Sequence, residues 1–240
     1  MNNKTAINKT LKMINLHNLI QSGDHIAVGV SGGKDSMFLL KVLSQIQKFY
    51  YKPFKLTAIC INMQVPNMDL SIITEFCKKE NIELKIVPSD IYEVVFNIRK
   101  EKNPCSLCAK LRRGLLCSFA KEIGANKLAL GHHSDDLIET FFLSLFYEGR
   151  LSTLAPKSFL DRTKITVIRP LLLISEQEIK DYVSLENLPI VKNLCPADHH
   201  TQRETLKNLV NELDSRFPKC KENIFNAITS PNRYNLWKEE

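Results

Sequence analysis

The segment that most constrains this chain is residues 31–36, Ser-Gly-Gly-Lys-Asp-Ser, which directly follows the apolar run at residues 26–30. A short apolar run, two glycines and an amphipathic pattern from Asp35 onward predict a buried strand, a tight loop and a helix. In such a turn, several backbone N–H groups and the helix N-terminus point at one place, which favours a phosphate or pyrophosphate group. An ordinary glycine-rich turn is the alternative interpretation.

Each residue type in the loop suits an anion. Gly32 and Gly33 have no Cβ, so the backbone can approach a phosphate closely, while Lys34 adds a positive charge and the serines offer hydroxyl donors. The spacing is not that of the Walker loop, which has four residues between its first glycine and its Gly-Lys pair. The loop resembles that of the N-type ATP pyrophosphatases, so ATP is the expected ligand. The predicted nucleotide contacts in it are Ser31, Gly32, Gly33, Lys34, Asp35 and Ser36.

Short apolar strands alternate with amphipathic helices along the chain, which predicts an α/β fold with a doubly wound, mainly parallel sheet. The expected strands are 25–30, 56–63, 82–88, 127–132 and 165–170, and the expected helices are 4–21, 35–49, 68–80, 106–123, 134–148, 175–187 and 201–215. We expect an N-terminal helix (1–22), a nucleotide-binding domain (23–190) and a small helical C-terminal segment (191–240).

Ligands of doubly wound sheets lie beyond the carboxyl ends of the strands. Asn62 and Gly131 follow predicted strands and are further expected nucleotide contacts. His133 can move a proton or stabilise charge at the α-phosphate, and Asp136 can hold Mg²⁺ against the phosphates. We therefore predict catalytic roles for Lys34, Asp35, His133 and Asp136. Simple capping of the following helix is the alternative for one of the two adjacent aspartates.

The chain has seven cysteines and no export signal at its N-terminus, so a disulfide framework is not expected. Cys105 and Cys108 precede a predicted helix at a spacing that lets both face one metal or cluster, with a redox dithiol as the rival interpretation. Cys195 lies in an irregular stretch before Pro196 and is the best third ligand. The others are expected to pack in the interior or elsewhere without a ligand role: Cys60, Cys77, Cys117 and Cys220.

The formal net charge is +7 and the pI is about 9.0, which suits a polyanionic partner such as RNA. A lysine-rich solvated surface explains the charge equally well. No apolar run reaches membrane-spanning length, so a cytoplasmic enzyme without a membrane partner is expected. The basic residues that are candidates for phosphodiester contacts are Lys110, Arg112, Arg113, Arg150, Lys157, Arg162, Lys164 and Arg169.

Beyond the loop, several segments stand in the order seen in one family. They are Pro-Cys-Ser-Leu-Cys-Ala-Lys-Leu-Arg-Arg-Gly at 104–114, Gly-His-His-Ser-Asp-Asp from 131, Val-Ile-Arg-Pro-Leu at 167–171, Asn-Leu-Cys at 193–195 and Gln-Arg at 202–203. Over essentially its whole length the chain resembles the tRNA 2-thiocytidine synthetase family, of the PP-loop superfamily.

This resemblance implies that Cys105, Cys108 and Cys195 hold a [4Fe-4S] cluster with one iron open for sulfur. It implies an enzyme that uses ATP and Mg²⁺ to adenylate the C2 oxygen of a tRNA cytidine, releasing pyrophosphate. Sulfur, delivered as sulfide or as a persulfide from a cysteine desulfurase, then displaces AMP. Family members are often dimers, so a homodimer is one option.

Two departures from the family pattern keep alternatives open. Lys192 replaces the first cysteine of a second pair, and residues 196–200 replace a Gly-Ser-Gln segment. Because Cys195 and His199 are spaced as zinc ligands can be, a Cys₃His zinc site is one alternative. Another is adenylation of a different acceptor, as in the 2-thiouridine enzymes or lysidine synthetase, and a third is a non-catalytic nucleotide- or cluster-binding module.

Overall fold

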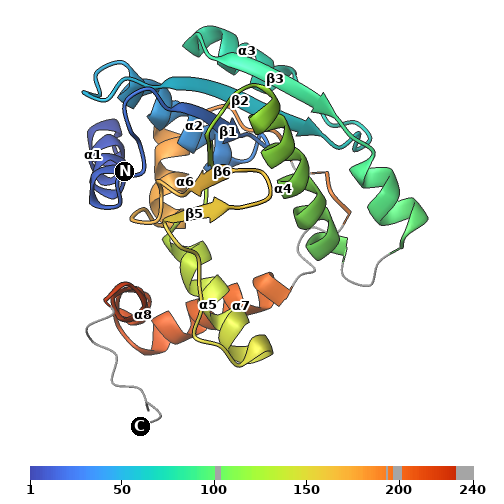
Figure 1. Ribbon diagram of the computed structural model, residues 1–240. Coiled ribbons are helices and arrows are strands. Elements are labelled where there is room, and N and C mark those ends of the chain that lie inside the picture. The colour runs from blue at the N-terminus through green and yellow to red at the C-terminus, as the bar shows by residue number, and fades with distance from the viewer. Residues whose placement is uncertain (101–103, 193, 197–201, 231–240) are drawn as a thin grey trace. The chain divides into compact units, whose positions relative to one another are not determined.

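The fold is built on a six-stranded sheet in the order β3-β2-β1-β4-β6-β5; Figure 1 labels these strands except β4. The computed structural model describes residues 1–100, 104–192, 194–196 and 202–230. All neighbouring strands run parallel except the pair β5–β6, which is antiparallel. The predicted α/β class with a mainly parallel sheet is therefore confirmed. The strands are β1 (His25–Gly29), β2 (Lys55–Asn62), β3 (Glu83–Pro88), β4 (Lys127–Ala129), β5 (Lys157–Leu160) and β6 (Ile165–Ile168).

Helices cover both faces of the sheet. On one face α4 packs through Leu116 and Cys117 on apolar residues of the central strands, among them Ala27 and Leu128. On the other face α2 is buried along most of its length, because α1 and α6 pack on its outer side. The helices are α1 (Asn3–Leu16), α2 (Lys34–Gln47), α3 (Ser71–Glu80), the π-helix η1 (Glu93–Ile98), α4 (Pro104–Glu122), α5 (Ser134–Glu148), α6 (Glu176–Leu185), α7 (Gln202–Arg216) and α8 (Cys220–Thr229).

The chain divides into two compact units. The first comprises residues 1–133 and 155–198 and contains the whole sheet; the second comprises residues 134–154 and 199–240. Within the second unit, α7 and α8 pack on α5. The sequence analysis divided the chain by expected role, with boundaries after residues 22 and 190, and this division stays a prediction.

Some elements differ from their predicted extent. The helix predicted over 4–21 ends at Leu16, because Asn18 takes a left-handed conformation with φ of 48°. Leu19 and Ile20 continue the apolar pattern of the helix and are fully buried, but they lie in the segment that follows it. The sequence analysis did not include β5, η1 or α8. Within the described residues, no helix combines the length and apolarity needed to cross a bilayer.

A buried ion pair fixes the amino ends of the two central strands. Lys127 Nζ lies 2.5 Å from Asp24 Oδ2, and both side chains are about 6% exposed. The same ammonium donates to the Leu19 carbonyl at 2.7 Å, and Asp24 also accepts from the amide of Asn126 at 2.8 Å. Burial disfavours the Asp24 carboxylate, but these donors outweigh it and lower the pKa of Asp24.

We expect Lys127→Met to destabilise the fold by about 3 kcal/mol, since it leaves the Asp24 carboxylate buried without a cation. Urea unfolding at pH 7 measures the change. The exposed pair Lys55–Glu83 is the matched control, and Lys55→Met is expected to cost less than about 1 kcal/mol. Equal losses in the two variants would contradict a structural role for the buried pair.

Candidate functional site

The loop after β1 presents backbone donors at the carboxyl end of the sheet. Gly32 has φ of +82°, and Gly33 is the extended N-cap of α2, with no side-chain hydrogen bond capping the helix. The serine hydroxyls hold the loop: Ser36 Oγ donates to the Gly33 carbonyl at 3.0 Å and accepts from the Ser31 amide at 3.1 Å. The first-turn amides of α2 have no acceptor within the helix, as at any helix start, so they can bind an anion.

Two segments pack tightly against this loop. A Cβ on Gly131, after β4, would lie 2.9 Å from the Asp35 carbonyl oxygen, and a Cβ on Gly32 would lie 2.6 Å from Val191 Cγ2. The Val191 amide also donates to the Gly32 carbonyl at 2.9 Å. Both glycines are therefore required by close packing, and the loop is held between the chain after β4 and the chain after α6.

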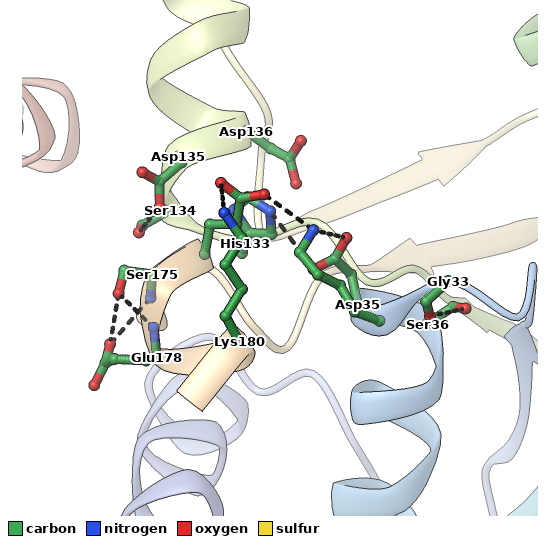
Figure 2. Close-up of polar contacts among 12 residues, drawn as sticks. Gly33, Asp35, Ser36, His133, Ser134, Asp135, Asp136, Ser175, Glu178 and Lys180 are labelled. Carbon is green, nitrogen blue, oxygen red and sulfur yellow. Dashed lines mark hydrogen bonds and ion pairs between the residues drawn. The ribbon is translucent and has the colours of Figure 1, made fainter. Parts of the chain in front are cut away.

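Lys34 lies in an ion network that joins α2 to α6. Its Nζ is 3.0 Å from Asp35 Oδ2 and 3.0 Å from Glu176 Oε1, and Lys180 Nζ is 3.2 Å from the other oxygen of Glu176. Figure 2 shows Lys180 reaching from α6 toward this network beside Asp35. Burial disfavours the ammonium, but the carboxylates of Asp35 and Glu176 outweigh that effect and raise the pKa of Lys34. Lys34 is thus charged and held at the loop.

Asp35 and His133 meet at the start of α2 (Figure 2). Asp35 Oδ1 is buried and accepts no hydrogen bond from the described residues, and the buried His133 Nε2 lies 3.8 Å from it. His133 is held by its backbone, which pairs with Leu171 after β6. An imidazole and a free carboxylate oxygen thus stand at the helix start that the loop offers to an anion.

The three predicted metal-ligating cysteines belong to the first unit. Cys105 and Cys108 are one turn apart at the start of α4. Burial raises the pKa of the Cys108 thiol, Arg112 opposes this, and the nearby Cys195 and Cys105 raise it further. Within the described ranges, no group of three or more His, Cys, Asp or Glu side chains is gathered as a metal site.

Cys108 also contacts the residue that follows β2, because its Sγ lies 3.7 Å from Met63 Sδ. Asn62, which precedes Met63, uses its side-chain oxygen to accept from the Gln64 amide at 2.9 Å. His199, the fourth ligand of the alternative zinc site, lies outside the described residues. The expected interior cysteines are buried, and burial raises the pKa of Cys60 and of Cys77 to about 11 each and that of Cys117.

The two aspartates after His133 belong to the second unit. There Arg203 Nη1 lies 3.2 Å from Asp136 Oδ1, and Lys221 Nζ lies 3.1 Å from Asp135 Oδ1. Glu139, one turn further along α5, is 5% exposed and lies 3.8 Å from Arg203. Burial, with Asp136 adding to it, raises the pKa of Glu139 to about 7.

The first unit thus brings together the loop, Gly131 and His133 at one edge of the sheet, whereas the three predicted cysteine ligands of the same unit are not gathered as a metal site among the described residues. Asp136 instead belongs to the second unit, where it pairs with Arg203 of α7. Sequence analysis missed Glu176 and Val191. The pattern Ser175 to Glu178 is a capping box that marks the start of α6, but nothing in it points to the Lys34 contact of Glu176.

Comparison with known proteins identifies the family of this chain. A family model described as a PP-loop domain matches residues 3–213. The tRNA-cytidine(32) 2-sulfurtransferase of Pseudomonas fluorescens is 41% identical over 213 residues, covering 88% of this chain and 78% of that protein. Its counterpart, tRNA-cytidine(32) 2-sulfurtransferase 2 of Francisella tularensis subsp. holarctica, is 38% identical over 229 residues, covering 95% and 86%.

Solved structures are similar as well. The U34-tRNA thiolase NcsA from Methanococcus maripaludis, solved with its [4Fe-4S] cluster, superposes with a TM-score of 0.78 at 25% identity, covering 94% of this chain and 76% of that one. The NH3-dependent NAD synthetase from Campylobacter jejuni has a TM-score of 0.52 at 16% identity and shares the fold. The predicted resemblance to the PP-loop superfamily and its thiocytidine branch is confirmed.

We expect Gly131→Ala to weaken ATP binding at least about tenfold, since relieving a backbone clash of this kind costs about 1–3 kcal/mol. The added methyl group pushes the first turn of α2 out of place. Isothermal titration with ATP measures the change. Gly114→Ala on α4 is the control, because its Cβ would meet nothing within 4 Å. The site description is wrong if the two variants bind ATP equally well.

We expect Glu139 to make the folded state less stable as pH rises from 4.5 to about 7. The folded protein keeps this proton in a range where the unfolded chain has lost it, so stability declines with pH and levels off above 7. Relative to Glu139→Gln, the wild-type protein should lose up to roughly 3 kcal/mol between pH 4.5 and 8. Denaturant unfolding across this range measures the difference. The exposed Glu148→Gln on the same helix should follow the wild-type profile, and a Glu139→Gln profile parallel to wild type would refute the assignment.

Proposed function

This chain belongs to the PP-loop family and, within it, to the tRNA-cytidine 2-sulfurtransferases, and from that membership we propose that it is an ATP-dependent tRNA thiolation enzyme. It replaces the C2 oxygen of a tRNA cytidine with sulfur and releases AMP and pyrophosphate. The observation that carries the proposal is the hydrogen bond from the Val191 amide to the Gly32 carbonyl. It connects the segment that leads to Cys195 with the nucleotide loop.

The loop at residues 31–36 binds the pyrophosphate part of ATP. The free amides at the start of α2 face the anion, and Lys34 can turn from Glu176 to a phosphate oxygen, because an ammonium on a flexible stem can exchange partners. Asp35 Oδ1 is a buried carboxylate oxygen without a hydrogen bond from the described residues, which suits a Mg²⁺ ion that accompanies the nucleotide. His133, at 3.8 Å from that oxygen, can donate a proton or stabilise charge near the α-phosphate.

Adenylation solves a leaving-group problem. The C2 oxygen of cytosine is a poor leaving group, and its attack on the α-phosphate turns it into a phosphoester that departs as AMP. The loop lowers the barrier of this step by stabilising the charge that develops on pyrophosphate. Asp136 remains a predicted participant, with Arg203 bound to it in the second unit.

The donor set at α4 fits an iron–sulfur cluster. Cys105, Cys108 and Cys195 are three thiols of the first unit, and soft thiolates are the ligands such clusters take. Arg112 favours the thiolate of Cys108, which is the form that binds metal. A [4Fe-4S] cluster held by these three cysteines would offer an open iron for the incoming sulfur.

The reach of the chain supports a shared site. Cys195 is four residues after Val191, so its Cα lies no more than about 14 Å from the residue that covers Gly32. Activated base and incoming sulfur can therefore meet between the loop and α4. The proposal extends to a cytoplasmic enzyme that takes sulfur as free sulfide or a protein persulfide, and that forms a homodimer.

A second candidate is thiolation of a tRNA uridine, because the similar NcsA structure is that of a U34-tRNA thiolase. Both candidates share the loop and the cysteines, and differ in the base that is adenylated. Mass spectrometry of tRNA nucleosides after reaction distinguishes 2-thiocytidine from 2-thiouridine.

We expect Cys105→Ala to abolish thiolation and to lower iron content after anaerobic purification, while ATP affinity stays within about twofold of wild type. Lys34→Ala should do the reverse, keeping iron near the expected four atoms per cluster and weakening ATP binding at least about tenfold, as loss of a charged hydrogen bond does. Iron and zinc analysis, ATP titration and nucleoside analysis measure these quantities on the same samples.

Cys117→Ala is the control, since this buried thiol on α4 is packed in the core and has no proposed ligand role. It should retain iron and thiolation. Stoichiometric zinc in the wild-type protein would replace the cluster by the Cys₃His alternative, and full thiolation by Cys105→Ala would end the proposal that this thiol holds the sulfur-delivering group.

A further inference from the structure

Arg169 is a buried cation at the carboxyl end of β6. It is 7% exposed, and its Nη1 donates to the Ala155 carbonyl at 2.7 Å and to Ser158 Oγ at 3.3 Å. Its Nε is buried and has no hydrogen-bond acceptor among the described residues. Neutral acceptors from β5 and the residues before it therefore orient the guanidinium, but they do not balance its charge. Such an arrangement is costly unless an anion completes it.

A second arginine approaches from α4, which packs on β6. Arg113 is exposed on α4, and after burial its positive charge is the second cause that lowers the pKa of Arg169. Across the described parts of the chain, no carboxylate lies within ion-pair distance of either arginine. A buried guanidinium with an unpaired Nε, beside a helix that carries a second arginine and without a counter-ion among the described residues, points to an anionic ligand.

We propose that Arg169 and Arg113 form a binding site for a backbone phosphate of the tRNA, adjacent to the nucleotide that is modified; this inference rests on the proposed function. A guanidinium presents paired donors that match the oxygens of a phosphodiester. Arg169 supplies a fixed, buried donor, and Arg113 supplies an adaptable one at the surface.

Position separates this site from the nucleotide loop. In the sheet β4 lies between β1 and β6, so the Arg169 strand is about 10 Å from the strand that leads into the loop. Arg113 is five residues after Cys108 on α4, a rise of about 7.5 Å. A phosphate bound here therefore lies beside the cysteines, where the target base has to be delivered.

The test compares binding of tRNA and of ATP to Arg113→Gln, Arg169→Lys and the wild-type protein. We expect Arg113→Gln to weaken tRNA binding about tenfold, as loss of one charged hydrogen bond does, and to reduce the slope of log K against log salt by roughly 1. Arg169→Lys keeps the charge but loses the paired donors, and it should weaken tRNA binding with a smaller change in slope. Both variants should bind ATP as the wild type does.

Lys121→Gln is the matched control, because it removes one exposed positive charge from the same helix α4, near its C-terminal end. It should leave tRNA affinity and salt slope within about twofold of wild type. Arg113 is exposed, so its variant tests the site even if Arg169→Lys fails to fold, as thermal unfolding would reveal.

Three outcomes overturn the inference. Unchanged tRNA affinity and salt slope in Arg113→Gln would show that no phosphodiester binds there. Loss of ATP affinity with unchanged tRNA binding would assign the anion to the nucleotide. Absence of tRNA binding by the wild-type protein would remove the proposed function and the site with it, a result distinct from the first two because those require a wild-type protein that binds tRNA.

Discussion

The close approach of backbone to backbone at Gly131 is the constraint on which the rest of the site depends. Because β1 and β4 are neighbours in the sheet, the segments that follow them lie at the same edge. Because Gly131 has no side chain, the segment after β4 can pack directly on the first turn of α2. His133 follows two residues later and is thereby placed beside Asp35. A helix start, a lysine and an imidazole gather there because two central parallel strands end side by side.

Electrostatics prepares this edge for an anion. Lys34 is already charged and already placed, since Asp35 and Glu176 share its ammonium while Lys180 balances Glu176. Under the proposed function, phosphate oxygens would replace these carboxylates as partners of the Lys34 ammonium. This exchange keeps a half-buried lysine paired in both states, which avoids the penalty of an isolated buried charge.

The parts of the fold that local pattern determines could be predicted from the sequence. The apolar run before the loop, the glycine pair and the amphipathic stretch after it are each local signals, and they led to β1, the loop and α2. β5 could not be found this way, because Lys157–Leu160 is a four-residue edge strand that exists through its pairing with β6. The end of α1 was missed for a related reason. Leu19 and Ile20 keep the helical period, yet tertiary burial places them in a turn stabilised by Lys127.

The site followed the same division. Motif residues such as Lys34 and Cys108 are visible in the sequence, whereas the contacts of Glu176 and Val191 join segments more than a hundred residues apart and leave no local trace. The roles assigned to the motif residues in binding and chemistry stay predictions. The structure adds which neighbours hold them.

The hydrogen bond from Val191 to the Gly32 carbonyl has a thermodynamic consequence. A shift of this carbonyl when an anion enters the loop would act on the Val191 amide, and through it on the segment that leads to Cys195. Under the proposed function, any energetic coupling through this contact would be reciprocal: nucleotide and cluster would each change the affinity of the protein for the other by the same factor. The Val191 amide would thus link nucleotide binding to the occupation of the thiols before the chemical step.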